Sequence, residues 1–596
     1  MCGIVGYIGN KKAIDVLMEG LTNLEYRGYD SAGVAVNVDG KVELYKAEGK
    51  LQNLKNIVEK NYTEISKSTI GIGHIRWATH GAPTVINAHP HTCNCGKVAV
   101  VHNGIIENFK ELRAKLEKQG CTFRSQTDTE TVAHLVATKF AQTKDLTEAV
   151  RLATKEIEGA YALCVIHQDV KDTIVATRRN APLLVGIGEG EYYIASDVPA
   201  IIQYTKKAID INNNPIQGKV EMLPWEPVAL SKMGYKHFML KEIHEQPDVV
   251  RNVLSGKLHA MDEPIHLKEV TLDKETLKNL NRIQIVACGT SLHAAMIGKY
   301  IIEDFCGIAV DVEPSSEYIY RKTITDKNTL VIGVSQSGET ADTITAVRQA
   351  KAKGSHILIV TNRPDSTMAR EADSLVPVYA GIEVSVAATK SYMAQLISFY
   401  LLAIYMAEVK GTMQEKDLAD LKHELIVLPQ KIEKVLSHKE DIQKCARAFS
   451  NSKDFIFIAR GINYPTALEG ALKLKEISYI NATGYTAGEL KHGPIAMLDE
   501  TMPVLSILMK GKVYDKILSN SEEARARNAR MIALTDSVDE KLSDLFSYII
   551  RIPEISEILS PALAIVPLQL LAYYIAEFLG KDVDQPRNLA KSVTVE

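Results

Sequence analysis

Apolar runs that alternate with helical spacing predict an α/β architecture for the C-terminal part of the chain. Residues 329–334 form an apolar run typical of a buried strand, and residues 341–350 have the spacing of a helix. The turn between them, 335–340, reads Ser-Gln-Ser-Gly-Glu-Thr. Backbone N–H groups and the positive end of the helix dipole favour an anion at such a turn, so the pattern indicates a phosphate site. Serine and threonine are also ordinary helix caps, and the spacing alone leaves that alternative open.

The same arrangement of strand, glycine and helix occurs twice. Residues 283–289 and 455–461 are β-runs that end in glycine and precede a helix rich in Ala and Leu. The later β-runs 356–361 and 530–535 end 72 and 74 residues after those two glycines. Such matched spacing predicts two copies of one α/β domain, each with a doubly wound parallel sheet.

The two copies differ where a ligand would bind. In sheets of this kind ligands lie beyond the carboxyl ends of the strands, which is where residues 288–291 and the turn 335–340 fall. The second copy has Met509-Lys510-Gly511 in place of Gln336-Ser337-Gly338, so it lacks the hydroxyl cluster. We therefore expect a phosphate only in the first copy.

At the N-terminus, Cys2 directly precedes a strand-like run, residues 3–9. Removal of Met1 would leave Cys2 with a free α-amine. The reference pKa of an α-amine, about 8, is close to that of a thiol, about 8.5, so one residue can supply both nucleophile and base. Without further motifs, a cysteine at the second position does not indicate a catalytic role.

Composition narrows the class of protein. A chain of 596 residues with 46% hydrophobic and 24% charged residues is typical of a soluble protein with several domains. The net charge of −4 and the lack of a basic run argue against a nucleic-acid partner. The apolar run 558–579 contains Pro561, Pro567, Gln569 and Glu577, which favours a buried helix over a membrane span.

The cysteines and the N-terminus indicate location. Eight cysteines without regular spacing favour a reducing compartment, and no basic segment of a signal peptide precedes Gly3, so we expect a cytoplasmic protein. Cys93 and Cys95 could be half of a metal site, but no second pair at zinc spacing follows them. We interpret them as two free thiols on a loop.

Five motifs in order resemble the class II glutamine amidotransferases, which use an N-terminal cysteine to hydrolyse glutamine. They are Cys2 with its following strand and residues 24–33, 73–81, 87–91 and 101–108. The resemblance implies an α+β glutaminase domain of the N-terminal nucleophile type. One departure is the loop 92–97, which is about two residues longer than the family pattern.

The resemblance also implies roles in glutamine hydrolysis. Cys2 corresponds to the nucleophile, and the Asn103 side chain and the Gly104 N–H correspond to the oxyanion hole. The residues implied to bind glutamine are Arg76, Thr79, His80 and Asp128. Trp77 resembles the residue that gates ammonia, and Arg27 resembles a supporting residue near the nucleophile.

The paired domains resemble sugar isomerase (SIS) domains, which bind phosphosugars. With the closing segment 586–596, nearly the whole chain resembles the isomerising glutamine–fructose-6-phosphate aminotransferases. That family makes glucosamine 6-phosphate and glutamate, the first step towards UDP-N-acetylglucosamine. The resemblance implies glutamine and fructose 6-phosphate as substrates, an internal ammonia channel, a homodimer, and chemistry that needs no metal or organic cofactor.

Further site residues follow from this second resemblance. His492 corresponds to the residue that opens the sugar ring, Lys591 to the Schiff-base lysine, Glu476 to the base and Lys473 to an assisting acid or hydroxyl partner. The residues implied to bind the sugar phosphate are Thr290, Ser291, Ser335, Gln336, Ser337 and Thr340, with backbone contacts from Val386 and Ala590. Ala388 stands where serine is common, and we leave it out of the site.

The spacing of charged residues, without any resemblance, also singles out the segment that contains Lys473 and Glu476. Glu469, Lys473 and Glu476 recur at i, i+4 and i+7, which places them on one face of a helix. A solvated salt bridge would give the same pattern and stays the alternative.

The predicted organisation has six parts. They are a glutaminase domain at 2–240, a linker at 241–276, a first SIS domain at 277–416, a helical connector at 417–447, a second SIS domain at 448–586 and a catalytic tail at 587–596. A phosphoribosyl-transferring amidotransferase would need an acidic pyrophosphate motif, and the chain has the repeat instead. A phosphosugar sensor without enzymatic activity would not need Cys2, Arg76 or Asn103.

Overall fold

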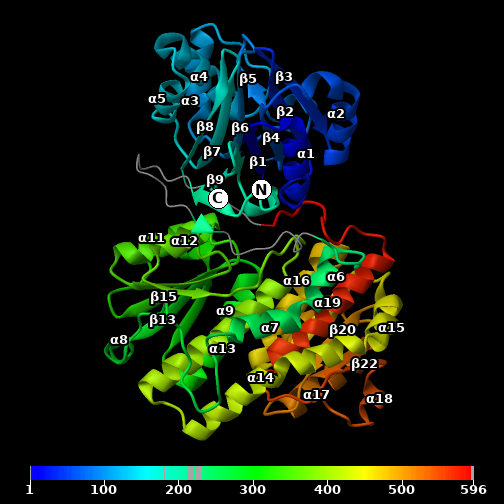
Figure 1. Ribbon diagram of the computed structural model, residues 1–596. Helices are drawn as coiled ribbons and strands as arrows, with labels where there is room; N and C mark the ends of the chain where they lie inside the picture. The colour runs from blue at the N-terminus through cyan, green and yellow to red at the C-terminus, as the bar shows by residue number, and fades with distance from the viewer. Residues whose placement is uncertain (1, 79, 180, 211–220, 223–230, 592–596) are drawn as a thin grey trace. The chain divides into compact units, whose positions relative to one another are not determined.

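The computed structural model describes residues 2–78, 80–179, 181–210, 221–222 and 231–591 (Figure 1). The chain forms two compact units. One holds the described residues up to Ser231 together with Ala590 and Lys591, and the other holds Lys232–Leu589.

The first unit is built on two antiparallel sheets. Of its described strands, eight form a sheet in the order β12-β11-β9-β10-β1-β4-β2-β3, and four form a sheet in the order β5-β6-β7-β8. The larger sheet contains β1 (Gly3–Ile8), β2 (Ser31–Val38), β3 (Lys41–Glu48), β4 (Ile70–Arg76), β9 (Leu184–Ile187), β10 (Tyr192–Ala195), β11 (Lys207–Asp210) and β12 (Glu221–Met222). The smaller contains β5 (His91–Thr92), β6 (Val98–Gly104), β7 (Tyr161–His167) and β8 (Val170–Arg179).

The two sheets pack face to face through a core that includes Ile4, Ile72 and Val101. Helices cover the outer faces: α1 (Ala13–Asn23) and α2 (Leu51–Ile65) contact the larger sheet, and α4 (Thr129–Thr143) contacts the smaller. The helices α3 (Phe109–Lys118) and α5 (Leu146–Thr154) pack beside α4. The unit therefore has four layers, helix, sheet, sheet and helix, as Figure 1 shows.

Small residues in β4 let α1 approach the sheet closely. A Cβ at Gly71 would lie 2.9 Å from both the Leu17 side chain and the Ala35 carbonyl oxygen, closer than real Cβ contacts allow. This close packing fixes β4, the strand that carries His74 and Arg76.

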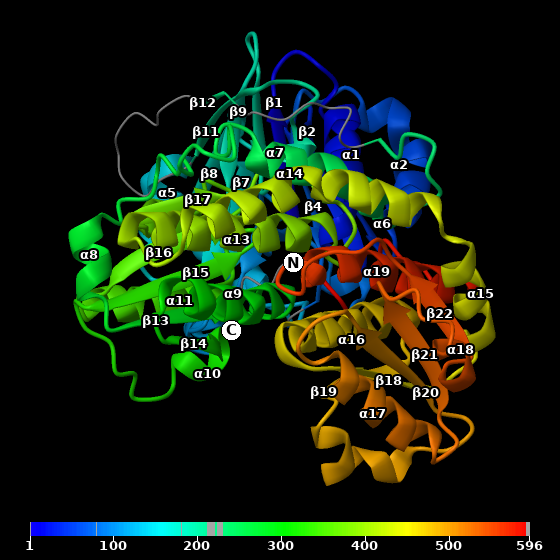
Figure 2. The ribbon, with the colours of Figure 1, turned by 90° about the horizontal axis from the view of Figure 1, so that it is seen from below.

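The second unit contains two parallel sheets with the same strand order. The first is β14-β13-β15-β16-β17 and the second is β19-β18-β20-β21-β22, and Figure 2 shows them as separate green and orange blocks. The strands of the first are β13 (Arg282–Ala287), β14 (Val310–Pro314), β15 (Thr329–Ser335), β16 (His356–Thr361) and β17 (Ser374–Pro377). Those of the second are β18 (Asp454–Ala459), β19 (Asn481–Thr486), β20 (Pro503–Leu508), β21 (Arg530–Thr535) and β22 (Tyr548–Arg551).

Helices join the two sheets into one core. The helices of this unit that matter most for the site are α9 (Thr290–Cys306), α11 (Ala341–Ala352), α13 (Lys390–Lys410), α16 (Tyr464–Ser478), α17 (Tyr514–Arg525) and α19 (Ser560–Phe578). In the first copy α9 packs on α13, in the second α16 packs on α19, and α9 also contacts α16 across the two copies. Through this contact the first turn of α9 meets Glu469 and Lys473 of α16.

Two helices of this unit, α13 and α19, have the length and apolarity of a membrane span. The most apolar windows of these helices are 83% and 89% buried inside the protein, respectively. The run 558–579 is thus a buried helix, as predicted, and α13 has the same character although its sequence was not singled out. Buried helices that are apolar on every side are typical of the centre of a large core.

The predicted fold class is confirmed: a two-sheet α+β domain is followed by two α/β domains with parallel sheets. The predicted linker 241–276 contains α7 (Gln246–Leu254) and ends inside α8 (Lys274–Asn279), and the predicted connector 417–447 begins in α14 (Glu415–Ser437) and ends in α15 (Glu440–Phe449). The six predicted domain limits stay predictions.

Candidate active sites

Cys2 directly precedes β1, and its thiol lies next to Trp77, the residue that follows β4. The Trp77 N–H donates to Cys2 Sγ at 3.3 Å, and the Cys2 thiol donates to the Trp77 carbonyl at 3.4 Å. The Trp77 ring meets the Tyr29 ring edge to face at 5.4 Å. Burial raises the pKa of the Cys2 thiol, so the thiol needs a base before it can act as a nucleophile.

Two side chains hold the backbone of Cys2. Asn103 Nδ2 and Arg27 Nε each donate to the Cys2 carbonyl at 3.2 Å. Arg27 is itself fixed by an ion pair with Asp197 at 2.6 Å. The structure therefore brings Cys2, Arg27 and Asn103 together.

His74 fixes the orientation of the Asn103 amide. His74 Nε2 lies 3.0 Å from Asn103 Oδ1 and 2.9 Å from the His102 carbonyl oxygen. Both partners are acceptors, so His74 is the tautomer with its proton on Nε2. The amide oxygen of Asn103 is occupied by this bond, and its NH₂ group faces Cys2.

His74 belongs to a buried cluster of histidines. The rings of His74 and His89 stack at 4.1 Å, and His91 meets His89 at 4.9 Å. Burial lowers the pKa of His74 to about 3 and lowers the pKa values of His89 and His91 well below the usual value. Burial also lowers the pKa of His102. The cluster is therefore neutral near pH 7, as the Nε2–H tautomer of His74 requires.

Arg76, one of the residues predicted to bind glutamine, has a buried side chain that is held by backbone carbonyls. Arg76 donates from Nη2 to the carbonyls of His80 and Gly81, and from Nη1 to the Ala82 carbonyl. Asp128 Oδ2 accepts from the Ile106 N–H at 2.8 Å. Thr79 lies outside the described residues. The structure places Arg76 and His80 in contact, and the glutamine-binding roles stay predictions.

In the second unit, the turn after β15 is held by its own hydroxyls. Ser335 Oγ lies 2.9 Å from Thr340 Oγ1 and accepts from the Gly338 N–H at 3.0 Å, while Ser337 Oγ accepts from the Glu339 N–H at 3.2 Å. Thr340 occupies the cap position of α11 but makes no side-chain cap bond. The alternative that the Thr340 side chain serves only as a helix cap is therefore wrong.

Glycine is required inside this turn. Gly338 has φ +64°, and a Cβ there would lie 2.0 Å from Ser366 Oγ. The turn and residues 288–291 follow β15 and β13, which are neighbours in register, with Ala287 opposite Val334. Both segments thus lie at the carboxyl edge of the sheet, where the site is predicted.

Glu469 and Lys473 of α16 contact α9 of the first copy. Lys473 Nζ lies 2.5 Å from Glu476 Oε2, 3.2 Å from Thr290 Oγ1 and 3.5 Å from Glu469 Oε1. Thr290 donates to Glu469 Oε1 at 3.1 Å. Glu469 and Lys473 both have side chains that are 0% exposed, so the solvated salt-bridge alternative is wrong.

The charge state of Lys473 follows from its neighbours. Burial alone lowers the pKa of Lys473, but the carboxylates of Glu476 and Glu469 outweigh this effect and raise it. Lys473 is therefore an ammonium ion near pH 7, suited to donate a hydrogen bond or a proton rather than to attack a carbonyl.

His293 adds a further contact across the two copies. His293 Nδ1 lies 2.7 Å from Glu469 Oε2, and His293 stands one turn after Thr290 on α9. His293 and His74 were not among the predicted site residues, and Glu469 was singled out by its spacing but given no role. Glu469 shares the helix face of Lys473, which was a usable signal, but the histidines are recognised only from contacts between distant segments.

The other predicted sugar-site residues have varied positions. Ser291 is buried and its Oγ accepts from Gln395 Nε2 at 3.0 Å, and the Val386 N–H donates to the Asp584 carbonyl at 3.0 Å. Gln336 is half-buried in the turn after β15, and His492 is exposed at the end of the short helix Glu489–His492. Ala590 and Lys591 belong to the first compact unit, so the roles predicted for them stay predictions.

Comparison with known proteins agrees with the two-part site. The glutamine amidotransferase domain matches residues 57–232, and the SIS domain matches residues 276–405 and 448–576. The glutamine–fructose-6-phosphate aminotransferase (isomerizing) of Gloeobacter violaceus is 49% identical over 615 residues and covers 100% of both chains. The protein of that name from Methanosarcina acetivorans is 45% identical over 623 residues, with the same full coverage.

A solved structure covers the second unit. The C-terminal domain of glucosamine-fructose-6-phosphate aminotransferase from Francisella tularensis is 36% identical with a TM-score of 0.56, and it covers 60% of this chain and 100% of that chain. With full-length relatives at nearly half identity and both domain types matched, the chain belongs to the glutamine–fructose-6-phosphate aminotransferase (isomerising) family.

Proposed function

We propose that this protein transfers the amide nitrogen of glutamine to fructose 6-phosphate and isomerises the product to glucosamine 6-phosphate, releasing glutamate. The observation that carries the proposal is the pairing of two different sites in one chain. One is a thiol at Cys2 beside the Asn103 amide, and the other is a Glu-Lys-Glu group on α16 that contacts Thr290, in the unit that also holds the hydroxyl-rich turn 335–340.

In the first half-reaction, Cys2 Sγ attacks the amide carbon of glutamine. The raised pKa of the Cys2 thiol supports a base in direct reach, and once Met1 is removed the α-amine of Cys2 is that base. The oxyanion is stabilised by Asn103 Nδ2 and the Gly104 N–H, a contribution of about 100- to 1000-fold in rate for one donor. Ammonia leaves, and water releases glutamate from the thioester.

Glutamine itself is held by its charged ends. Arg76 suits the α-carboxylate because its planar fork donates two parallel hydrogen bonds, which here go to backbone carbonyls. Asp128 suits the α-ammonium. Trp77 is the ammonia gate in this proposal, because its backbone touches Cys2 Sγ on both sides and movement at the nucleophile would reach its ring.

In the second half-reaction, the sugar phosphate is bound by the hydroxyls of Ser335, Ser337 and Thr340. Lys591 forms a Schiff base with C2, and ammonia replaces the lysine. Glu476 then moves a proton between C1 and C2, with Lys473 as its ammonium partner 2.5 Å away. Because Lys473 stays protonated, the Schiff base is assigned to Lys591 and not to Lys473.

Ring opening needs an acid–base group that reaches the sugar, and we assign it to His492. Its exposure at the end of a short helix supports a role in a site completed by a second copy of the chain, so the active form is a homodimer. A mixed dimer of an inactive chain and a His492→Ala chain should then regain activity. The eight free thiols support a reducing compartment, the cytoplasm, as the site of action.

The test is product analysis with fructose 6-phosphate and amide-¹⁵N glutamine. The wild-type protein should give labelled glucosamine 6-phosphate and an equal amount of glutamate. Cys2→Ala should give neither product from glutamine, but it should still make the amino sugar from added ammonia, because the second site is intact. Glutamate without amino sugar would overturn the assigned acceptor, and amino sugar from Cys2→Ala with glutamine would overturn the nucleophile.

A further inference from the structure

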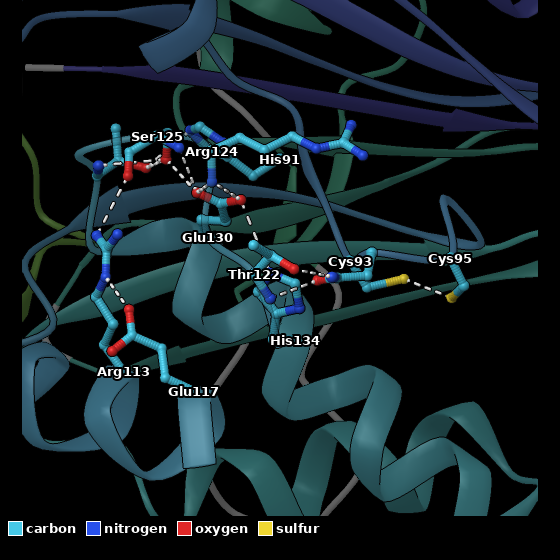
Figure 3. Close-up of polar contacts among 12 residues, drawn as sticks. His91, Cys93, Cys95, Arg113, Glu117, Thr122, Arg124, Ser125, Glu130 and His134 are labelled. Carbon is cyan, nitrogen blue, oxygen red and sulfur yellow. Dashed lines mark hydrogen bonds and ion pairs between the residues drawn. The ribbon is translucent and has the colours of Figure 1, made fainter. Parts of the chain in front are cut away.

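A pair of thiols lies at the tip of the hairpin that joins β5 to β6. The tip is a tight turn, residues 93–96, in which the Gly96 N–H donates to the Cys93 carbonyl at 3.0 Å and Gly96 has φ +70°. Cys93 and Cys95 are separated by one residue, and their Sγ atoms lie 2.9 Å apart (Figure 3).

The turn is anchored from outside. Asn94 Nδ2 donates to Thr122 Oγ1 at 2.9 Å, and Asn94 Oδ1 accepts from the Thr122 N–H at 3.3 Å. Asn94, the residue between the two thiols, is therefore fixed by two hydrogen bonds to Thr122.

The two thiols differ in access. Cys95 is exposed, whereas Cys93 is 4% exposed and packs in the core with Val98 and Leu116. Burial raises the pKa of the Cys93 thiol, and the hydrogen bond to Cys95 adds to this shift. An oxidant in solution thus meets Cys95 first, and Cys93 is the slower second thiol.

The surroundings of Cys93 and Cys95 do not favour metal binding. Within the described residues, no group of three or more His, Cys, Asp or Glu side chains is placed to hold a metal ion. The pair is also separate from the glutamine site, because it precedes β6 whereas Asn103 and Gly104 stand at the other end of that strand. Two thiols in contact without further ligands are suited to redox chemistry.

We propose that Cys93 and Cys95 form a dithiol that hydroperoxides oxidise reversibly to a disulfide within the loop. The Cys95 thiolate attacks one oxygen of the peroxide, the O–O bond breaks, and hydroxide leaves, giving a sulfenic acid. The Cys93 thiolate then attacks the Cys95 sulfur, and hydroxide leaves again. Two thiols and one hydrogen peroxide molecule thus yield one disulfide and two water molecules.

The geometry supports closure and reopening. A disulfide has an S–S length of about 2.05 Å, so the sulfur atoms need to approach by less than about 1 Å. Because Cys95 is exposed, a thiol reductant can attack the closed bond. Exposed disulfides of this kind are reducible and do not serve as permanent braces.

The sequence permits a direct test on the full-length protein. Trypsin cleavage after Arg76 and Lys97 releases peptide 77–97, which contains Cys93 and Cys95 and no other cysteine. Reduced protein is treated with hydrogen peroxide, and its free thiols are alkylated with N-ethylmaleimide. After trypsin digestion, the mass of peptide 77–97 is measured by mass spectrometry. We expect it to lose two hydrogens and carry no alkyl label, and dithiothreitol before alkylation should restore two labels.

Variants separate this reaction from general thiol oxidation. In Cys93→Ser the Cys95 sulfenic acid has no partner, so dimedone should trap it in greater yield than in the wild type. Cys121→Ser is the matched control and should leave the mass change of peptide 77–97 intact. Two labels after peroxide, a crosslink to the Cys121 peptide, or oxidation of Cys95 to the sulfinic acid without loss of Cys93 labelling would each overturn the proposal.

Discussion

His293 of the first SIS domain and Glu469 of the second meet at 2.7 Å between Nδ1 and Oε2. The Glu469 side chain is completely buried and also contacts Thr290 and Lys473. One carboxylate therefore joins α9 to α16 and sets the position of the ammonium group that faces Glu476.

Replacing this carboxylate should impair sugar amination alone. We expect Glu469→Gln to lower the rate of glucosamine 6-phosphate formation by about 10- to 100-fold, since hydrogen bonds to charged groups contribute about 1.5–3 kcal/mol. Glutamate release measured without sugar should stay at the wild-type rate. His293→Asn keeps a donor and should be milder, and Glu522→Gln, exposed on α17, is the control. Equal loss in both half-reactions would contradict this role.

His74 should act on glutamine hydrolysis only through Asn103. His74→Phe removes the donor to Asn103 Oδ1, so the amide can rotate and glutaminase activity should fall by up to about 100-fold. In the Asn103→Ala background the same change should have little further effect, because the group that His74 orients is gone. Steady-state kcat for the two single variants and the double variant measures this coupling. If the reductions in kcat of the two single variants multiply in the double variant, His74 acts independently of Asn103.

The buried histidines should make the amidotransferase unit sensitive to acid. The pKa of His74 is about 3 in the folded protein and about 6.5 in an unfolded chain. Below pH 6.5 the unfolded chain binds protons that the folded unit does not, so the free energy of unfolding falls as pH falls towards 3. His74 alone removes about 2 kcal/mol at pH 5, and His89, His91 and His102 act in the same direction.

Urea unfolding followed by tryptophan fluorescence is suited to this measurement. Both tryptophans of the chain, Trp77 and Trp225, lie in the amidotransferase part of the sequence. The midpoint should shift to lower urea between pH 7 and pH 5. A constant midpoint over this range would mean that the histidines titrate normally.

The phosphate turn should matter in the first SIS domain and not in the second. Ser337→Ala removes one hydroxyl donor and should raise KM for fructose 6-phosphate by about 10-fold, with glutaminase activity without sugar unchanged. Lys510→Ala is the matched variant in the corresponding loop of the second copy, where Lys510 pairs with Glu554 at 3.0 Å. We expect no change in KM for this variant. A similar rise for both would contradict a single phosphate site.

Local pattern was sufficient to predict much of the fold. Strands β16 and β21 occupy the predicted runs 356–361 and 530–535, because a buried parallel strand is a short, continuous apolar segment. The repeat followed from spacing, and the two sheets have the same strand order. Helix α13 was overlooked because its sequence is apolar on every side and has no periodic polar face.

The site was harder to predict for a physical reason. Lys473 and Glu476 share one helix face, so spacing of three and four residues reveals them. His293 and Glu469 are 176 residues apart, and only the packing of α9 against α16 brings them together. Whether a charged helix face is solvated or buried also depends on that packing. The spacing of Glu469, Lys473 and Glu476 is therefore equally compatible with a solvated salt bridge and with a buried group.

The contact between α9 and α16 bears on how the duplicated domain has evolved. Two identical copies would each carry a phosphate turn and a set of acid–base groups, whereas here Thr290 and His293 come from one copy and Glu469 and Lys473 from the other. Neither copy can form these contacts without its neighbour, as in an obligate heterodimer whose subunits are covalently linked. Substitutions at these four positions should therefore be inherited as a set, and an exchange of one half between relatives that differ at these positions should disrupt the contacts.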